Sequence, residues 1–285
     1  MHSNLSDWYS SGYYLPFDGI KLFVRSQGVG QPILCLHAFP TSSFDYSRIA
    51  QYLAKQYKLC FLDYPGFGFS EKPKGFSYSL LKYADAAEKA IEYLGLKDIW
   101  LLAHDIGDSI ALELMKRGNL QIERIIMLNG SIYSIPFDDP VMWLSQRLWI
   151  HKVSGPLISK LRLFRKPLFA RMMNRIFARP LSKEEVDVFW SLLQFNNGLR
   201  NYHHLMQYMP ERWQHQFEWL DALKATPANI SLIWGQADPV ATPAVAEFVC
   251  KMRSDINYIK LEYVGHYPHW EKPELVANFV QKLFE

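Results

Sequence analysis

The sequence predicts an α/β fold with a mostly parallel central sheet and helices on both of its faces. Short runs rich in apolar and β-branched residues alternate with segments of helical period through most of the chain, and this order is typical of parallel sheets. Several runs are apolar without interruption, as expected for strands covered by helices on both sides. The alternation stops between about residues 134 and 223. We therefore expect one α/β core, 1–133 and 224–285, interrupted by a helical insertion, 134–223.

The expected strands and helices follow one another along the chain. The runs with strand character are 19–28, 32–39, 58–66, 98–105 and 122–130 before the insertion, and 229–238 and 257–266 after it. The segments with helical spacing are 44–56, 79–96, 109–118, 242–255 and 273–284. The helix at 79–96 is the clearest, because its apolar residues recur every three or four positions. Gly118 ends the third helix, as glycine commonly does.

Composition and charge exclude several classes of protein. The apolar content of 49% and the charged content of 21% are those of a globular enzyme. A formal charge of +3 is too small to make nucleic acid the expected partner. Cys35, Cys60 and Cys250 lie far apart and are odd in number, which indicates reduced thiols. The first residues do not resemble a signal peptide, and no apolar run is long enough to span a bilayer. We expect a cytoplasmic protein.

Three polar residues follow predicted strands at the edge where sites form in open parallel sheets. Asp105 ends "IWLLAHD", Asp238 ends "ISLIWGQAD", and His266 ends "IKLEYVGH". Asp105 also has a small residue two positions before it, Ala103, and another two positions after it, Gly107. A nucleophile held on a tight strand-to-helix turn needs this spacing. The pattern predicts a nucleophilic carboxylate, with an acid and a histidine beside it.

An ionised carboxylate at this turn can attack an electrophilic carbon and form an alkyl-enzyme ester. A histidine then activates water against the ester, and a second acid supports its positive charge. Each residue also fits a structural role. Asp105 fits a helix N-cap, Asp238 a turn before Pro239, and His266 a loop histidine. The order and placement of all three together favour catalysis. Ser109 is not at the centre of the turn, so a serine nucleophile fails on spacing.

The motifs "HAFPTSS", "DYPGFGFSEKP", "HDIGD", "GQADPV" and "GHYPHWEKP" occur in this order. With them the chain resembles the α/β-hydrolase superfamily over nearly its whole length. Within that superfamily it resembles the epoxide hydrolases and haloalkane dehalogenases, which use an aspartate nucleophile. It is most similar to hydrolases of the mesoderm-specific-transcript type. The resemblance implies an α/β-hydrolase fold with a helical cap inserted after the sixth core strand.

The resemblance also implies roles for individual residues. Asp105 would be the nucleophile, Asp238 the charge-stabilising acid and His266 the base. The backbone N–H groups of Phe39 and Ile106 would form an oxyanion hole, with a cis peptide bond before Pro40. The chain departs from the family at Ala38, where glycine is usual, and alanine fits if its φ stays negative. It also departs at Asp108, where many relatives have a small residue, and we interpret Asp108 as an anion in the first turn of a helix.

The departures also bear on the substrate. Dehalogenases commonly hold the leaving halide with a Trp and an Asn, whereas this chain has Ile106 and Phe39 at those positions, which cannot donate from their side chains. Epoxide opening instead needs a proton donor, and the family supplies two lid tyrosines. Candidates here are Tyr202, Tyr208 and Tyr133, although packed lid aromatics are an alternative interpretation. We expect epoxide hydrolysis; a dehalogenase, an ester or lactone hydrolase, and a membrane-associated binding protein with little turnover are alternatives.

The predicted partners are a small apolar substrate and water, with no cofactor. The spacing of the histidines does not indicate a zinc site. In the insertion, apolar residues from Leu168 to Phe177 alternate with Arg171, Arg175 and Arg179 at helical spacing. The apolar face would cover the active site, or the helix would dock on anionic lipid as a peripheral membrane contact. Ser182 and Glu185 form the pattern of a capping box. The sequence sets no oligomeric state.

Overall fold

The computed structural model describes residues 3–130, 132–133 and 140–284. Its centre is one eight-stranded sheet with the strand order β1-β2-β4-β3-β5-β6-β7-β8. The strands are β1 (Tyr13–Phe17), β2 (Ile20–Gln27), β3 (Gln31–Leu36), β4 (Tyr57–Leu62), β5 (Ile99–His104), β6 (Ile122–Leu128), β7 (Asn229–Gly235) and β8 (Asn257–Leu261). The pairs β1–β2 and β2–β4 are antiparallel, and the other pairs are parallel. The predicted α/β fold with a mostly parallel sheet is confirmed.

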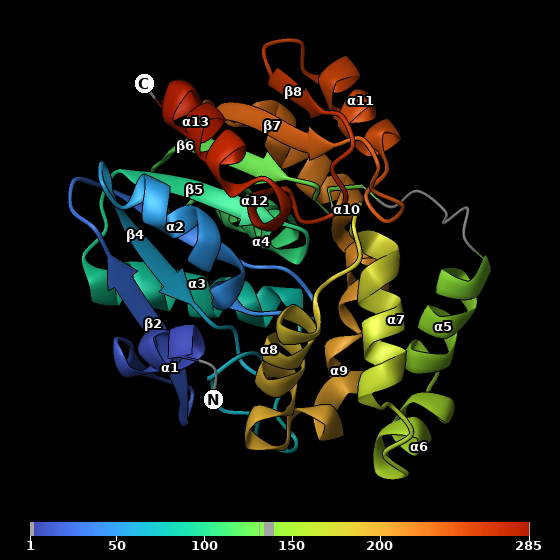
Figure 1. The fold of residues 1–285 in the computed structure, drawn as a ribbon. Coiled ribbons are helices and arrows are strands. Elements are labelled where there is room, and N and C mark those ends of the chain that lie inside the picture. The colour runs from blue at the N-terminus through green and yellow to red at the C-terminus, as the bar shows by residue number, and fades with distance from the viewer. Residues whose placement is uncertain (1–2, 131, 134–139, 285) are drawn as a thin grey trace.

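Helices cover both faces of the sheet (Figure 1). The core helices are α2 (Ser47–Leu53), α3 (Leu80–Leu94), α4 (Ile106–Arg117), α11 (Pro243–Met252), α12 (Pro268–Glu271) and α13 (Pro273–Phe284). α3 packs on α4, whereas α2 packs on α12 and α13. The parallel strands between these layers are buried along most of their length, because both of their faces are covered.

Two N-terminal elements were not predicted from the sequence. Helix α1 (Ser3–Ser10) precedes β1, and β1 forms a hairpin with β2 through Asp18 and Gly19. Both turn residues have positive φ, 44° and 76°, as a two-residue hairpin turn requires. The Asp-Gly pair is a typical hairpin turn. The strand before it has only five residues, which was too short a pattern to predict β1 from the sequence.

The segment between β6 and β7 is helical. Its elements are α5 (Pro140–Ile150), α6 (Ser154–Lys160), α7 (Lys166–Ile176), α8 (Lys183–Gln194), the 3₁₀ segment η2 (Phe195–Asn201), α9 (Tyr202–Leu205) and α10 (Tyr208–Ala225). We call α5 to α9 the cap helices. They lie beside the sheet, at the end toward which the arrow of β7 points (Figure 1). Helix α8 begins with the predicted capping box between Ser182 and Glu185.

The predicted boundary of the insertion at residue 134 lies outside the described residues, so the division into core and cap at 133/134 and 223/224 stays a prediction. Helix α10 continues past residue 223 to Ala225 and packs on α4 of the core. Among the described helices, none is long and apolar enough to cross a membrane.

Candidate active site

Asp105 occupies a tight turn between β5 and α4. Its backbone has φ 53° and ψ −114°, a left-handed conformation that residues other than glycine rarely adopt. Gly107 lets the turn approach the sheet, because a Cβ atom at this position would lie 2.2 Å from the carbonyl oxygen of Leu36. The close contact between α4 and β3 therefore explains why the sequence pattern has a small residue two positions after Asp105.

The Asp105 carboxylate is almost fully buried, with 3% of the residue exposed. The backbone N–H of Phe39 donates to its Oδ2 atom at 3.0 Å. The peptide bond between Phe39 and Pro40 is cis, as the resemblance implied. Ile106 is buried and begins α4. Both residues of the expected oxyanion hole therefore lie next to Asp105, Phe39 in the loop after β3 and Ile106 directly after Asp105 in the chain.

His266 and Asp238 form a buried pair. The Nδ1 atom of His266 lies 2.7 Å from Oδ2 of Asp238, and both side chains are almost inaccessible to solvent. Burial acts to lower the pKa of His266, but the negative charges of Asp238 and Asp105 outweigh it and raise the pKa above its usual value. Asp238 therefore favours the imidazolium form of His266 and holds it through Nδ1.

A further polar residue, Asn129, hydrogen-bonds Asp238 of this pair. It was not predicted from the sequence. Its Nδ2 donates to Asp238 Oδ2 at 2.8 Å, and its Oδ1 accepts from the Gly235 N–H at 2.7 Å. Asp238 Oδ1 accepts from the N–H of Val240 at 2.7 Å, so both carboxylate oxygens are held. Asn129 directly follows β6 and has a φ of 38°. Its position at a strand end, like that of Asp105, was the signal that could have identified it.

The loop that carries His266 is fixed from two sides. His104, the last residue of β5, donates from Nε2 to the carbonyl oxygen of His266 at 2.7 Å. The N–H of His266 donates to the carbonyl oxygen of Ile176, at the end of α7, at 2.8 Å. The backbone of His266 thus connects the strand that positions Asp105 with a cap helix.

A cavity of about 160 Å³ adjoins His266. Its wall comes from Phe39 and Val240 of the core and from side chains of α5, α7, α9 and α10. Most of these side chains are apolar, among them Trp149, Met173 and Ile176. An enclosed, largely apolar space beside buried titratable groups is the usual form of a small-molecule site.

Two of the three predicted proton donors line this cavity, namely Tyr202 and Tyr208. The ring of Tyr202 is fully buried and lies 5.4 Å from that of Phe39. Its hydroxyl has no hydrogen-bond partner among the described residues. Tyr208 also packs on Phe39, at 5.1 Å. Burial and the nearby charge of Asp105 raise the pKa of Tyr208, which keeps its hydroxyl protonated.

The third candidate, Tyr133, lies elsewhere. Its ring stacks on Phe248 of α11, with 4.7 Å between centroids, and it is not among the described residues that line the cavity. Of the three predicted proton donors, Tyr202 and Tyr208 are therefore the ones that line the cavity.

Asp108 lies in the first turn of α4, as interpreted from the sequence, but its surroundings do not favour an anion. It is fully buried, and neither of its carboxylate oxygens has a hydrogen-bond partner among the described residues. Burial and the charge of Asp105 raise its pKa well above the usual value. Gly130 leaves room for it, because a Cβ there would overlap Asp108 Oδ2. Asp108 is therefore a buried acid beside the nucleophile turn, and its surroundings favour the protonated form.

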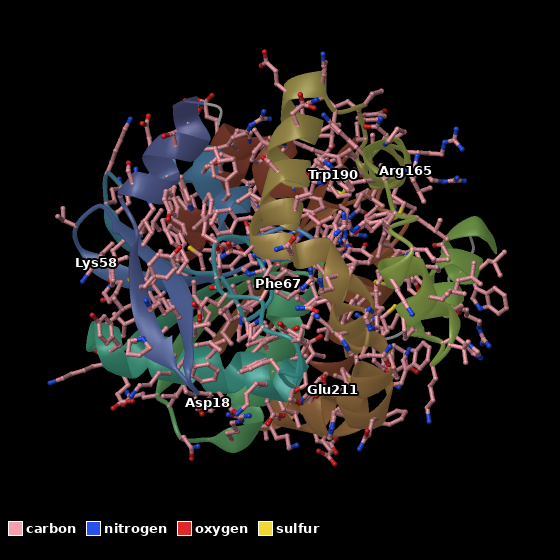
Figure 2. All side chains as sticks on the ribbon, turned by 90° about the horizontal axis from the view of Figure 1, so that it is seen from below. Asp18, Lys58, Phe67, Arg165, Trp190 and Glu211 are labelled. Carbon is pink, nitrogen blue, oxygen red and sulfur yellow. The ribbon has the colours of Figure 1, made fainter. Side chains whose placement is uncertain are left out.

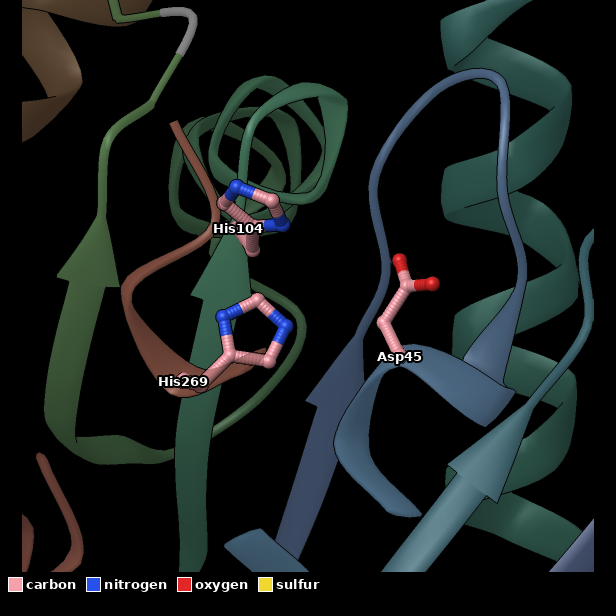
Figure 3. A group of neighbouring side chains, drawn as sticks. All are labelled: Asp45, His104 and His269. Carbon is pink, nitrogen blue, oxygen red and sulfur yellow. The ribbon is translucent and has the colours of Figure 1, made fainter. Parts of the chain in front are cut away.

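Among the described residues, one group has the composition of a metal site. Asp45, His104 and His269 are fully buried, and one potential ligand atom from each lies within 4.8 Å of the others (Figure 3). Sequence spacing did not indicate this group, because its members come from three separate elements. Burial lowers the pKa of both histidines, so both are neutral. None of the three is among the described residues that line the cavity.

Comparison with known proteins shows the family to which this chain belongs. The sequence model of the alpha/beta hydrolase fold family matches residues 31–273. The putative hydrolase LipZ of Mycobacterium tuberculosis is 33% identical, over 96% of this chain and 96% of its own length. The human mesoderm-specific transcript homolog protein is also 33% identical, over 94% of this chain and 84% of its own length.

Solved structures show the same fold. The epoxide hydrolase CorEH superposes with a TM-score of 0.79 at 18% identity, covering 96% of this chain and 98% of that one. The haloalkane dehalogenase DatA of Agrobacterium tumefaciens superposes with a TM-score of 0.85 at 17% identity, covering 96% of each chain. Likeness at this identity concerns the fold and leaves the choice of substrate to the residues of the site.

Proposed function

Since this chain belongs to the α/β-hydrolase family and is an α/β-fold hydrolase, we propose that it hydrolyses apolar epoxides through a covalent ester at Asp105. The observation that carries the proposal is the content of one cavity. Two protonated tyrosines and His266 line it, and the charge of Asp105 acts on both His266 and Tyr208. The base and the proton donors therefore line one largely apolar cavity, and the nucleophile is hydrogen-bonded to Phe39 of its wall.

In the first half-reaction, Asp105 attacks an epoxide carbon. The Phe39 N–H holds Oδ2, so the new C–O bond forms at Oδ1. The epoxide C–O bond breaks as that bond forms, and negative charge develops on the epoxide oxygen. The hydroxyl of Tyr202 or Tyr208 hydrogen-bonds this oxygen and supplies its proton, a contribution typically worth about 10²–10⁴-fold in rate.

In the second half-reaction, His266 removes a proton from water through Nε2, and the water oxygen attacks the ester carbonyl carbon of Asp105. The carbonyl oxygen, which is the former Oδ2, becomes an oxyanion facing the Phe39 N–H. Asp238 stabilises the imidazolium that forms, from 2.7 Å away. As the intermediate collapses, the His266 imidazolium gives its proton to the departing alkyl oxygen, and the diol is released. The second proton of the water passes from the Asp105 carboxyl group to the tyrosinate left by the first half-reaction. This step regenerates the neutral tyrosine and the Asp105 carboxylate, which retains one oxygen from water.

Haloalkane dehalogenation is the second candidate, since DatA shares the fold. Release of a halide needs donors at the leaving group. The two residues beside Asp105, Phe39 and Ile106, offer only backbone N–H groups, because their side chains carry no donor. The tyrosine hydroxyls fit an epoxide oxygen better, since they can give it a proton.

The fate of the water oxygen tests the covalent mechanism. A single turnover in ¹⁸O-labelled water, with an aryl epoxide and excess enzyme, should place label in the Asp105 carboxylate, detected by mass analysis of its peptide. Label in the diol alone would reject the ester and favour direct attack by water.

The substrate class is tested separately with epoxides and haloalkanes of equal size. We expect diol formation and little or no halide release. Tyr202→Phe and Tyr208→Phe, singly and together, should slow ester formation far more than ester hydrolysis, while Tyr133→Phe serves as the control. Brisk halide release would reject the epoxide proposal, as would an unchanged rate of ester formation in the double variant.

A further inference from the structure

The cap carries an unusual share of the positive charge of the chain. Between residues 140 and 180 there are nine Lys and Arg residues and no Asp or Glu. The whole chain has 31 basic and 28 acidic residues, so the rest of it has 22 basic and 28 acidic residues and is net acidic. The small net charge of the protein hides a strongly basic segment, confined to helices α5 to α7 and their connections.

The same segment exposes large apolar side chains. Trp143, Leu144 and Leu148 of α5 are 44–53% exposed, and Leu157 of α6 is 49% exposed. The connections and α7 add Val153, Leu161, Leu163 and Leu168, which are 47–67% exposed. We call these eight residues the apolar cap surface. Helices α5 and α6 pack on each other and lie at the edge of the molecule (Figure 1). A monomeric protein rarely exposes so many leucines together unless they bind something.

The same segment of the cap also contains a groove lined by basic side chains. This groove of about 790 Å³ lies between the cap helices and is lined by Lys160, Arg162, Arg165 and Arg200, and by Lys166, which pairs with Asp187, among others. None of its lining residues is acidic, and no carboxylate of the described residues pairs with any of the first four cations. Phe164 and Trp190 form the aromatic part of its wall, and Figure 2 labels Trp190 and Arg165 in the cap. The groove therefore offers uncompensated positive charge beside exposed leucines.

The surface also adjoins the substrate cavity. Ser145 and Gln146 of α5 and Leu168, Arg171 and Met172 of α7 line that cavity. Leu168 and Arg171 are exposed at the same time. Helix α7 thus contributes both to the outer surface and to the wall of the cavity.

We propose that the apolar cap surface docks on an anionic phospholipid membrane, with the leucines inserted among the acyl chains and the Lys and Arg residues at the phosphate level. An interfacial segment with leucine and tryptophan on one side and many cations around it has this chemistry. The docking itself is independent of catalysis. The entry of an apolar substrate from the bilayer between α5 and α7 rests on the proposed function.

Other occupants fit the surface less well. A symmetric dimer through this face would bring two segments together that each carry nine cations and no acid, since a two-fold interface uses the same patch twice. A nucleic acid would match the cations but would leave the leucines exposed. Only a lipid surface matches both features.

Vesicle sedimentation of the purified full chain tests the proposal without any substrate. We expect binding to vesicles of phosphatidylcholine with one-third phosphatidylserine, at least tenfold weaker binding to phosphatidylcholine alone, and weakening by salt. Replacing Leu157, Leu161 and Leu163 together by Ser should reduce binding at least tenfold. The pair Lys160→Glu and Arg165→Glu should do the same. The matched control replaces exposed residues elsewhere, Leu275→Ser with Lys97→Glu and Lys251→Glu, and should bind like the wild type.

The outcomes separate docking from catalysis. Hydrolysis of a short, water-soluble epoxide should be unchanged in the docking variants, because none of the replaced residues lines the substrate cavity. No binding to phosphatidylserine vesicles at low salt would overturn the proposal, and so would equal binding of all variants. A dimer in solution that the leucine substitutions dissolve, without vesicle binding, would assign the face to self-association. The result of the ¹⁸O-labelling experiment on Asp105 does not depend on any of these outcomes, so failure of docking and failure of the proposed function can be distinguished.

Discussion

At the scale of single residues, Asp105 and Asp108 show how the same side chain takes two roles within one turn of helix. Asp105 accepts a hydrogen bond from the backbone N–H of Phe39, a residue of the cavity wall. Asp108 faces inward, where it meets Gly130 and receives no hydrogen bond from the described residues. The charge of Asp105 and burial together favour the protonated form of Asp108.

Asp108→Asn should change how stability depends on pH. In the unfolded chain Asp108 ionises near its ordinary pKa, whereas in the folded protein burial and Asp105 keep it protonated to a higher pH. The folded state binds more protons in this window, so the free energy of unfolding falls as the pH rises through it. Asparagine does not titrate. The variant should therefore gain on the wild type as the pH rises above about 4, by about 1.4 kcal/mol for each unit of pKa difference.

Urea denaturation of both proteins across the pH range measures this effect. Asp98→Asn, at an exposed position, is the matched control. Parallel stability curves for wild type and Asp108→Asn would mean that Asp108 is not held neutral in the fold.

His266→Gln should separate the two half-reactions. Glutamine cannot activate water, while Asp105 keeps its position and its hydrogen bond to Phe39. The ester should accumulate and be detectable by mass on the Asp105 peptide, with turnover reduced at least about 10²-fold. His203→Gln, in a cap histidine bonded to Ser159, is the control. Normal turnover without an adduct would remove His266 from the role of base.

At the scale of elements, the packing of α4 against β3 positions the nucleophile. The helix begins directly after Asp105, and Gly107 lies where any side chain would collide with the Leu36 backbone. The collision partner is a central strand, which cannot shift without disturbing β4 and β5 on either side of it. The strained backbone of Asp105 is maintained because β5 before it belongs to the sheet and α4 after it packs against the sheet.

Gly107→Ala should therefore reduce both stability and activity. We expect a loss of about 2–3 kcal/mol in the free energy of unfolding, as for an overpacked core, together with slower ester formation because Asp105 moves. Gly118→Ala at the end of the same helix is the comparison. Gly118 has a φ of 65° and open space around its Cβ position, so it should cost about 1 kcal/mol and leave ester formation unchanged. Equal effects of both substitutions would contradict the contact argument.

The elements that could be predicted are those whose residue types depend directly on their burial. The parallel strands are apolar because helices cover both faces, and the polar residues after them mark the site edge; Asp105, Asp238 and His266 were located in this way. Asn129 lies at a similar strand end, but asparagine before glycine also fits an ordinary turn. The group of Asp45, His104 and His269 depends on contacts between distant elements, which no local pattern records. The lid tyrosines were ambiguous for the same reason, since burial of an aromatic residue does not say which cavity it faces.

At the scale of the whole molecule, Glu185 joins the cap to the core. It belongs to α8, and its carboxylate accepts from Trp270 Nε1 at 3.0 Å and lies 2.7 Å from Arg48 Nη2, both in the core. Within the cap it bonds Arg179 and the N–H of Ser182. Burial alone would raise the pKa of Glu185, but Arg179, Ser182, Trp270 and Arg48 outweigh it and hold the pKa well below its usual range.

Glu185→Gln should loosen the cap in a pH-dependent way. At neutral pH the variant keeps the shape of the side chain but loses the charge that Arg48 and Arg179 face, so we expect a loss of about 2 kcal/mol in the free energy of unfolding. Because the folded pKa is depressed, this contribution is fully present above the unfolded value near pH 4 and is lost as the pH falls through and below it. Urea denaturation followed by tryptophan fluorescence at pH 7 and pH 3 should show a large difference between variant and wild type at the first pH and a small one at the second. Glu184→Gln, the exposed neighbour on the same helix, should match the wild type at both; a variant difference that does not depend on pH would show that Glu185 joins cap and core through shape rather than charge.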